Sequence, residues 1–397
     1  MISVKSFKQI PNAVYAYYDY PVEGKNSDMV IVSNKEIDQY HEAAGKCYEM
    51  MEEAAKHVIK NKLYSKLGIP EFMEEVIEYT FKNRNIHVHP IARFDFAGGM
   101  DCLPIKMIEC NADTPFSIFE TALAQAYVAK DNNYPDEAQY NWIFEGVKNT
   151  MEYSRSFGQF TNSIIFSSYE DPEDILNTKI LGEACEDAGF STDWINWEKL
   201  WVNKDIGVFT SEDDKTISNT AARLFKMIPW EIIIEESEDM ARGLSDTILA
   251  GNLIVHNPPY VMLFQSKGLM AIMSEIFPDS PYLLKTVFSG SDKVTEFLNK
   301  FDYSFVSKPI WGREGNNIEF VKNKNLKNKT EGPYNIFPMI IQEIAEFPQD
   351  ESGRRYQAGV FVSDGEGVGL GFRRTNTDEK YEVITTAHEV CGHLIEN

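Results

Sequence analysis

Residues 91–115, IARFDFAGGMDCLPIKMIECNADTP, decide the fold because they contain two short apolar runs separated by turn residues. The first run covers residues 91–96 and the second covers residues 103–110. Between them, Gly98-Gly99-Met100-Asp101 has the composition of a tight turn. The stretch therefore predicts a β-hairpin.

The predicted hairpin carries charged and amide side chains that strand pairing would bring together. Alternate side chains of a strand lie on one face, so Arg93 shares a face with Asp95, and Glu109 shares one with Asn111. Two carboxylates and an amide suit Mg²⁺, which prefers oxygen ligands at about 2.0–2.1 Å. The guanidinium would neutralise charge on a transferred phosphoryl group. From these residues alone, a ladder of surface salt bridges remains the open alternative.

Directly after the hairpin, Thr114-Pro115 has the composition of a helix cap followed by a first-position proline. This pair predicts a helix that runs to about Lys130. The free N–H groups of such a helix start suit a carboxylate or a phosphate, while a plain cap is the alternative.

A second candidate site lies at residues 308–318, where Lys308 ends a predicted strand and Gly312 and Gly315 follow in a loop. Glycines let backbone N–H groups close over phosphates, and the lysine supplies positive charge. An ordinary hairpin turn explains the pattern equally well, because the GxxxxGK[ST] sequence of a P-loop is absent.

Other candidate residues carry weaker signals. Lys267, before a predicted helix, and Arg373, in a predicted strand, are each more typical of solvated ends when taken alone. His87 and His89 have no third ligand near them in the sequence and are interpreted as structural. Residues 388–393, HEVCGH, resemble HExxH, but their histidines are five apart and do not share a helical face. GxSxG and an early GxGxxG are absent, so neither an α/β-hydrolase nor a dinucleotide-binding domain is supported.

The chain before the hairpin is predicted to be helical. Apolar residues at spacings of three and four over residues 35–61 indicate an amphipathic helix, with a capping box of Ser33 and Glu36 at its start. Pro70 suits the first position of a second helix. A further helix is expected at residues 138–154.

The remainder predicts a mixed α/β and α+β fold. From residue 163, strands and helices alternate as in a small parallel α/β domain, with strands at 164–166, 206–209 and 253–255 and helices at 174–187 and 217–227. After Pro281 come helices and then an antiparallel sheet, with strands at 303–308, 317–321, 339–344, 356–362 and 368–373. The lysine- and asparagine-rich residues 322–329 are expected to form an exposed loop.

Composition limits the class of protein. The chain has 397 residues, room for two or three domains, and its 43% hydrophobic and 25% charged residues exclude a disordered chain, a collagen or a pure coiled coil. The 61 acidic and 38 basic residues give a net charge of −23, which disfavours binding to nucleic-acid phosphates and to anionic membranes. Solubility and a site for a cationic substrate both explain this charge.

Five cysteines without a CxxC pair fit reduced thiols better than a disulfide framework. The first residues lack the apolar run of a signal peptide, and no uninterrupted apolar stretch of about 18 residues occurs. A soluble cytoplasmic protein is therefore expected.

With these residues in view, the sequence resembles the glutathionylspermidine synthase family, in its C-terminal synthetase domain of the ATP-grasp type and without the amidase domain. The matching stretches lie in family order and cover most of the chain from about residue 90. They are RFD (93–95), IECNADTP (108–115), QSKG (265–268), KPI (308–310), GREGNNI (312–318), IQE (341–343) and GLGFR (369–373).

The resemblance implies a permuted ATP-grasp fold with a small parallel pre-ATP-grasp domain. Residues 1–160 would hold a helical region and the metal-site hairpin, residues 161–260 the pre-ATP-grasp-like domain, and residues 261–397 the nucleotide-binding region. ATP and two Mg²⁺ ions are the implied cofactors.

The same resemblance implies a role for each candidate residue. Arg93 would stabilise the transition state, and Thr114 would approach the carboxylate substrate. The implied metal ligands are Asp95, Glu109 and Asn111. The implied ATP contacts are Arg93, Asp95, Lys267, Lys308, Gly312, Arg313, Gly315, Gln342, Glu343 and Arg373. Two positions depart from the family pattern, since Phe116 replaces a serine and Ile232 a threonine.

The expected activity is ATP-dependent amide formation between a carboxylate and an amine through an acyl phosphate. The substrates would be a peptide or amino-acid carboxylate and a polyamine or other amine, and family analogy suggests a homodimer. No nucleic-acid or membrane partner is expected. The alternative is an ATP-binding regulatory protein that keeps the fold without ligase activity, and the intact set of Arg93, Asp95, Glu109, Asn111 and Lys308 argues against it.

Overall fold

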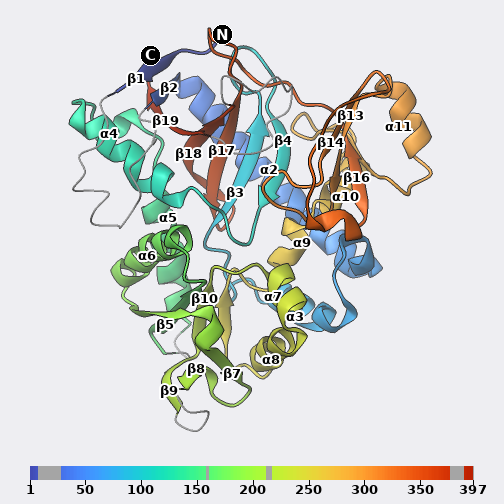
Figure 1. Cartoon of the computed structure of the whole chain (residues 1–397). Helices are drawn as coiled ribbons and strands as arrows, with labels where there is room; N and C mark the ends of the chain where they lie inside the picture. The colour runs from blue at the N-terminus through green and yellow to red at the C-terminus, as the bar shows by residue number, and fades with distance from the viewer. Residues whose placement is uncertain (8–27, 158–160, 212–216, 376–388, 397) are drawn as a thin grey trace.

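The computed structural model describes residues 1–7, 28–157, 161–211, 217–375 and 389–396, which form four sheets and the helices around them (Figure 1). The helices are α2 (Asn34–Asn61), α3 (Glu74–Lys82), α4 (Gln125–Asp131), α5 (Ile143–Arg155), α6 (Pro172–Asp187), α7 (Trp230–Glu236), α8 (Glu238–Leu249), α9 (Val261–Gln265), α10 (Gly268–Ile276) and α11 (Val294–Lys300). Among the described residues, no helix is both long and apolar enough to cross a bilayer.

The largest sheet has seven strands, and it takes them from both ends of the chain. Its order is β1 (Val4–Ser6), β2 (Asp28–Val32), β19 (Glu389–Ile395), β18 (Glu366–Arg374), β17 (Tyr356–Ser363), β3 (Ala92–Ala97) and β4 (Lys106–Asn111). All neighbours pair antiparallel except β2 and β19. The first and last thirds of the chain therefore build one surface together.

The predicted hairpin is confirmed as β3 and β4. Its turn needs glycine, because Gly98 and Gly99 have φ of +75° and +81°. A Cβ atom on Gly98 would also lie only 1.9 Å from the Pro104 carbonyl oxygen. In the pairing register, Arg93 lies opposite Asn111 and Asp95 lies opposite Glu109, so all four side chains belong to one face.

The opposite face of this sheet packs on α2, whose start has the predicted capping box. The Ser33 hydroxyl accepts the Glu36 N–H, and the Glu36 carboxylate accepts the Ser33 N–H. Buried residues of the helix, such as Cys47 and Met51, join the core under β3, β17 and β18. Hydrophobic burial, at roughly 25 cal/mol per Å² of apolar surface, is what holds the helix against the sheet.

A five-stranded antiparallel sheet faces the hairpin side of the large sheet (Figure 1). Its order is β12 (Thr286–Phe288), β16 (Met339–Gln342), β13 (Phe305–Pro309), β14 (Glu319–Lys322) and β15 (Asn325–Lys329). The prediction of a loop over residues 322–329 was wrong, because residues 325–329 form β15. This edge strand pairs through its backbone and exposes lysine and asparagine side chains, as is typical of protected edges.

A small parallel sheet completes the predicted α/β part. Its order is β11 (Ile254–His256), β10 (Arg223–Lys226), β5 (Ser163–Ser168) and β6 (Ser191–Asn196), and all three pairings are parallel. The mixed α/β and α+β class predicted from the sequence is thereby confirmed.

Two local predictions in this part were wrong, and the start of one predicted helix before it was misplaced. Residues 217–227 are not a helix, since they form β10 and part of a separate antiparallel sheet of β7 (Leu200–Asn203), β8 (Gly207–Ser211) and β9 (Ile217–Ala221). β10 is a central strand buried on both faces, which removes the alternating pattern that would identify it. Residues 206–209 belong mostly to β8 and so lie outside the parallel sheet. The helix expected from residue 138 begins at Ile143, after a short 3₁₀ turn at residues 136–138.

Candidate active site

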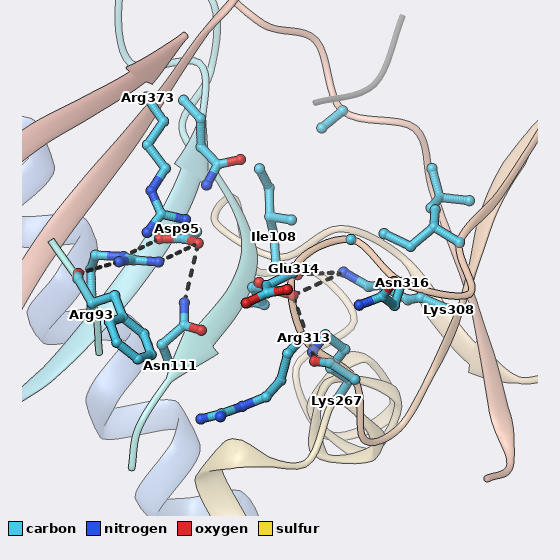
Figure 2. A pocket seen from close by; sticks show the side chains of 18 of the residues that line it. Arg93, Asp95, Ile108, Asn111, Lys267, Lys308, Arg313, Glu314, Asn316 and Arg373 are labelled. Carbon is cyan, nitrogen blue, oxygen red and sulfur yellow. Dashed lines mark hydrogen bonds and ion pairs between the residues drawn. The ribbon is translucent and has the colours of Figure 1, made fainter. Parts of the chain in front are cut away.

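A cavity of about 600 Å³ lies between the seven-stranded and five-stranded sheets (Figure 2). It brings together every residue that the sequence predicted for the site. These are Arg93, Asp95, Glu109, Asn111, Thr114, Lys267, Lys308, Gly312, Arg313, Gly315, Gln342, Glu343 and Arg373. Residues from positions 93 to 373 therefore converge on one space, as the predicted pairing of strands required.

On the hairpin side, Arg93 and Asp95 form a two-pronged ion pair. Arg93 Nε donates to Asp95 Oδ1 at 2.7 Å and Nη2 donates to Oδ2 at 3.1 Å, while Asn111 Nδ2 donates to Oδ2 at 3.1 Å. Burial would raise the pKa of Asp95, but the guanidiniums of Arg93 and Arg373 hold that pKa below its usual value. Gly359 of β17 leaves room for Arg93, since a Cβ there would lie 3.0 Å from Arg93 Cδ.

Glu109 connects the hairpin to the lysines of the opposite wall. Its Oε2 lies 3.3 Å from Lys267 Nζ and 4.0 Å from Lys308 Nζ. Burial raises the pKa of Glu109 and the charge of Asp95 adds to this, but the two lysines outweigh both and lower the pKa. Asp95 and Glu109 thus lie close enough to repel each other, a repulsion that a cation between them would relieve.

The lysines are held in place by backbone carbonyls. The Lys308 side chain is 4% exposed, and its Nζ donates to the Ile108 carbonyl at 2.9 Å. Lys267 Nζ donates to the Gly312 carbonyl at 2.8 Å. Burial lowers the pKa of Lys308 to about 8, and the neighbouring Lys267 contributes to this. Two like charges held together inside a protein favour a polyanionic ligand.

Arg373 supplies a second guanidinium beside Arg93. Its Nη2 donates to the Ser117 hydroxyl at 3.2 Å. Burial and the charge of Arg93 lower its pKa to about 10, while Asp95, Glu109 and Glu120 oppose this. The cavity therefore concentrates positive charge on both of its walls.

Thr114 lies on the cavity wall, but the helix that was predicted to begin there starts at Ile118. The Thr114 hydroxyl accepts a hydrogen bond from Arg313 Nη2 at 2.6 Å, so it is a side-chain partner rather than a helix cap. The intervening Phe116 carbonyl accepts Arg93 Nη1 at 2.5 Å, and Ser117 has a φ of +71°. These contacts with remote strands explain why a local capping pattern failed.

At the far end of the cavity, Gln342 and Glu343 leave β16 beside an apolar slot. Gln342 Nε2 donates to the Thr286 hydroxyl at 3.2 Å, and Glu343 Oε2 accepts the Lys285 N–H at 3.0 Å. The apolar lining of the cavity includes Ile108, Leu284, Val306, Ile344 and Phe347, of which Val306 lies opposite Gln342 in the sheet and Ile344 follows Glu343. A flat aromatic ring with hydrogen-bonding edges suits such a slot.

Sequence reasoning assigned no role to six polar residues of the cavity, namely Ser117, Glu120, Glu173, Glu314, Asn316 and Gln357, although Glu314 and Asn316 belong to the predicted loop at residues 308–318. Glu120 begins a π-helical turn, Glu120–Ala124, a feature that often marks functional sites. Gln357 lies opposite Arg373 in the sheet, so its position on this face follows from the register. No sequence pattern identifies Ser117 or Glu173.

Two of the histidines that were considered as metal ligands, His89 and His393, have other hydrogen-bond partners. His89 Nε2 lies 2.6 Å from the Ala112 carbonyl and its Nδ1 lies 3.0 Å from the Tyr48 hydroxyl. His393 Nε2 accepts the Tyr140 N–H at 2.7 Å. His87 is buried, and His388 lies outside the described residues.

Comparison with known proteins shows the family of this chain and several similar proteins. A family model described as glutathionylspermidine synthase preATP-grasp matches residues 8–396. A Haemophilus influenzae protein named "Putative acid--amine ligase" is 28% identical over 384 residues, which are 93% of this chain and 92% of that protein. The bifunctional glutathionylspermidine synthetase/amidase of Escherichia coli is 24% identical over 362 residues, 83% of this chain but only 54% of that protein. The apo structure of a glutathione synthetase-like effector from Globodera pallida aligns with a TM-score of 0.49 at 12% identity, covering 87% of this chain and 86% of that one.

Proposed function

The chain belongs to the glutathionylspermidine synthase family, whose fold is of the ATP-grasp type, and we propose that it joins a carboxylate to an amine at the expense of ATP. The observation that carries this proposal is the single cavity in which two guanidiniums, two lysines and two carboxylates meet. Phosphoryl transfer depends on positioning and on neutralising charge, and this set of residues does both.

The nucleotide would lie along the five-stranded sheet. Gln342 and Glu343 would contact the adenine edge in the apolar slot, and Lys267 and Lys308 would pair with its phosphates. The loop of Gly312, Arg313 and Gly315 would close over the phosphates. In support, Lys308 is a buried cation without a dedicated carboxylate, since Glu109 lies 4.0 Å away and is shared with Lys267.

The donor set of the hairpin fits Mg²⁺. Asp95, Glu109 and Asn111 present hard oxygen atoms on one face, and the repulsion between the two carboxylates favours a cation. We propose that these three residues hold two Mg²⁺ ions together with the phosphates. When bound, the ions would neutralise charge on the phosphates and polarise the transferred group.

The proposed reaction has two steps. A carboxylate oxygen of the acid attacks the γ-phosphorus of ATP, the bond to the ADP oxygen breaks, and an acyl phosphate forms. Arg93 and Arg373 would stabilise the charge on the transferred group, and Thr114 with Arg313 would orient the acid. The amine nitrogen then attacks the acyl carbon, loses a proton, and releases inorganic phosphate as the amide forms.

Glutathione and spermidine are the first substrates to test, because the name of the E. coli relative contains both. That relative is nearly twice as long as the matched region, so its substrates come to this chain only as a proposal. Glu120 and Glu173 place carboxyl groups on the cavity wall, which suits an amine that arrives protonated.

The test is a turnover screen. ADP release is measured with ATP, Mg²⁺, glutathione or other peptide acids, and spermidine or hydroxylamine, which traps acyl phosphates as hydroxamates. We expect ADP and product only when an acid and an acceptor are both present, and no turnover by the Asp95→Ala/Glu109→Ala variant. Persistent turnover by that variant would refute the metal assignment. Tight ATP binding without turnover on any pair would favour a regulatory protein.

A further inference from the structure

Asp113 lies between two cavity residues but is not itself part of the cavity. Asn111 and Thr114 line the cavity on either side of it, while Asp113 is 0% exposed. Its carboxylate extends away from the cavity, into the small parallel sheet. A charged group buried so completely requires a dedicated set of partners.

Those partners come from the carboxyl ends of the parallel strands. Lys226, the last residue of β10, donates from Nζ to Asp113 Oδ1 and to the Ile228 carbonyl, the latter at 3.0 Å. The Trp230 N–H, at the start of α7, donates to Asp113 Oδ2 at 2.7 Å. Lys226 is also 0% exposed and lies 4.9 Å from the centre of the Trp230 ring.

The backbone of the same segment is held from two further elements. Asn257, which follows β11, donates from Nδ2 to the Asp113 carbonyl and to the Ile91 carbonyl just before β3. The side-chain oxygen of Gln265, the last residue of α9, accepts the N–H groups of Ala112 and Asp113 at 2.7 Å and 3.1 Å. Every polar atom of Asp113 thus has a partner in the protein.

Open parallel sheets usually bind their ligands in the crevice at the carboxyl ends of the strands. Here the chain's own Asp113 carboxylate occupies that position, between the end of β10 and the first turn of α7. The small sheet therefore binds and holds the segment that follows the hairpin, through the Asp113 carboxylate.

We propose that Asp113 and Lys226 are positioning residues that fix Asn111 toward the metal and Thr114 toward the acid. This inference rests on the proposed function, because it assigns consequences to the metal and acid sites. Lys267, Lys308, Gln342 and Glu343 lie outside this segment, so we expect nucleotide affinity to depend less on the pair than the metal and acid sites do.

The alternative is that the pair contributes only stability. Loss of stability lowers the fraction of folded protein, and so lowers apparent kcat, but it leaves the binding constants of the folded molecules unchanged. Loss of positioning raises those constants. Replacing residues that orient metal ligands typically costs about 10–100-fold in metal affinity or activity.

The chain offers a matched control on the same strand. Arg223 of β10 is also 0% exposed, but its guanidinium donates to the Ser154 hydroxyl and carbonyl, at 2.8 Å and 3.1 Å, and not to the site segment. Lys226→Met and Arg223→Met each remove one buried cation from β10. Both variants are expected to melt at lower temperature than the unaltered protein.

The experiment titrates Mn²⁺ against each full-length variant with ADP present, followed by electron paramagnetic resonance, and measures the acid KM in the hydroxamate assay. We expect Lys226→Met to weaken Mn²⁺ binding by at least about tenfold and to raise the acid KM. The ADP affinity of Lys226→Met, measured in EDTA, should stay within about twofold of that of the unaltered protein, because the residues proposed to hold the nucleotide lie outside this segment. Arg223→Met should change none of these constants.

If Lys226→Met does not fold, the Asp113→Asn/Lys226→Met variant removes both charges together and is measured in the same way. If the Lys226→Met and Arg223→Met variants have equal dissociation constants for Mn²⁺ and equal KM values for the acid substrate, the inference is overturned. Failure of the proposed function is a separate result, since the unaltered protein would then bind Mn²⁺ with ADP yet form no hydroxamate with any acid. An unaltered protein that binds no Mn²⁺ would refute both the metal site and its positioning.

Discussion

Asp95 and Asp113 lie 18 residues apart in the chain and each forms a buried ion pair, yet only the pair of Asp95 faces the cavity. The side chains of Arg93 and Asp95 are 4% and 3% exposed, and those of Lys226 and Asp113 are 0% and 1% exposed. Burial alone does not distinguish the pairs. The first opens on a space that a ligand can enter, whereas the second has all its partners within the protein. Arg93 can therefore act on a substrate, while Lys226 can only hold the chain.

The largest effect is expected when the cavity-facing cation is removed. Arg93→Ala should lower kcat by about 10³-fold or more, because arginines that neutralise a transferred phosphoryl group contribute on that scale. Lys is not an equivalent replacement for a two-pronged guanidinium, so Arg93→Lys should recover little of the loss. Steady-state ADP release measures both variants. A loss of less than about tenfold in Arg93→Ala would contradict the catalytic role.

Removing the carboxylate of Asp113 should lower stability, in addition to the loss of positioning proposed above. Asp113→Ala leaves Lys226 charged and unpaired in the interior, which costs about 3–5 kcal/mol of unfolding free energy. Asp95→Ala should cost less, because water in the cavity can solvate Arg93. Denaturant unfolding gives the unfolding free energy of both variants. An equal loss in Asp113→Ala and Asp95→Ala would contradict the difference proposed between the two ion pairs.

The buried histidines His89 and His393 should make the unfolding free energy of the protein decrease in acid. His89 donates to the Ala112 carbonyl, next to Asp113, and burial lowers the pKa of His89 to about 4 and that of His393 to about 3. The unfolded chain binds protons on these histidines below about pH 6.5, so their stabilisation is present above that pH and is lost as pH falls toward 4.

This loss should amount to on the order of 1–3 kcal/mol for each histidine. Unfolding free energy measured between pH 7 and 4.5 tests the expectation, and His89→Gln should flatten the dependence. His57 is exposed on α2, so His57→Gln serves as the control and should leave the dependence unchanged. A profile that does not change in His89→Gln would argue against this source of acid sensitivity.

The smallest effect is expected at the point where the segment after Asp113 meets the glycine loop. Thr114→Val removes the hydroxyl that accepts Arg313 Nη2 but keeps the shape of the side chain. A hydrogen bond to a charged group contributes about 1.5–3 kcal/mol, so the acid KM should rise about tenfold while the ATP KM stays constant. Equal changes in both constants would place Thr114 outside the acid site.

The parts of the site that could be predicted from the sequence are those that local patterns determine. The hairpin and the loop after Lys308 follow from local patterns, namely turn glycines between apolar runs and alternate residues on one face. Strand pairing then made the meeting of Arg93, Asp95, Glu109 and Asn111 predictable.

The segment after Asn111 was not predictable, because distant residues fix its conformation. The Phe116 carbonyl is held by Arg93 and the Ser117 hydroxyl by Arg373, and these contacts delay the helix to Ile118. β10 was misread for a related reason, since a central strand that carries the buried Arg223 and Lys226 shows no alternation of polar and apolar residues.

The direct test of the whole account is the fate of an oxygen label. The acid is supplied with ¹⁸O in its carboxylate, and the inorganic phosphate released with the amide is analysed by mass spectrometry. Attack of the carboxylate on the γ-phosphorus transfers one ¹⁸O atom to each phosphate, together with one ADP. Unlabelled phosphate, or ¹⁸O in AMP, would contradict the acyl phosphate route that this cavity is proposed to support.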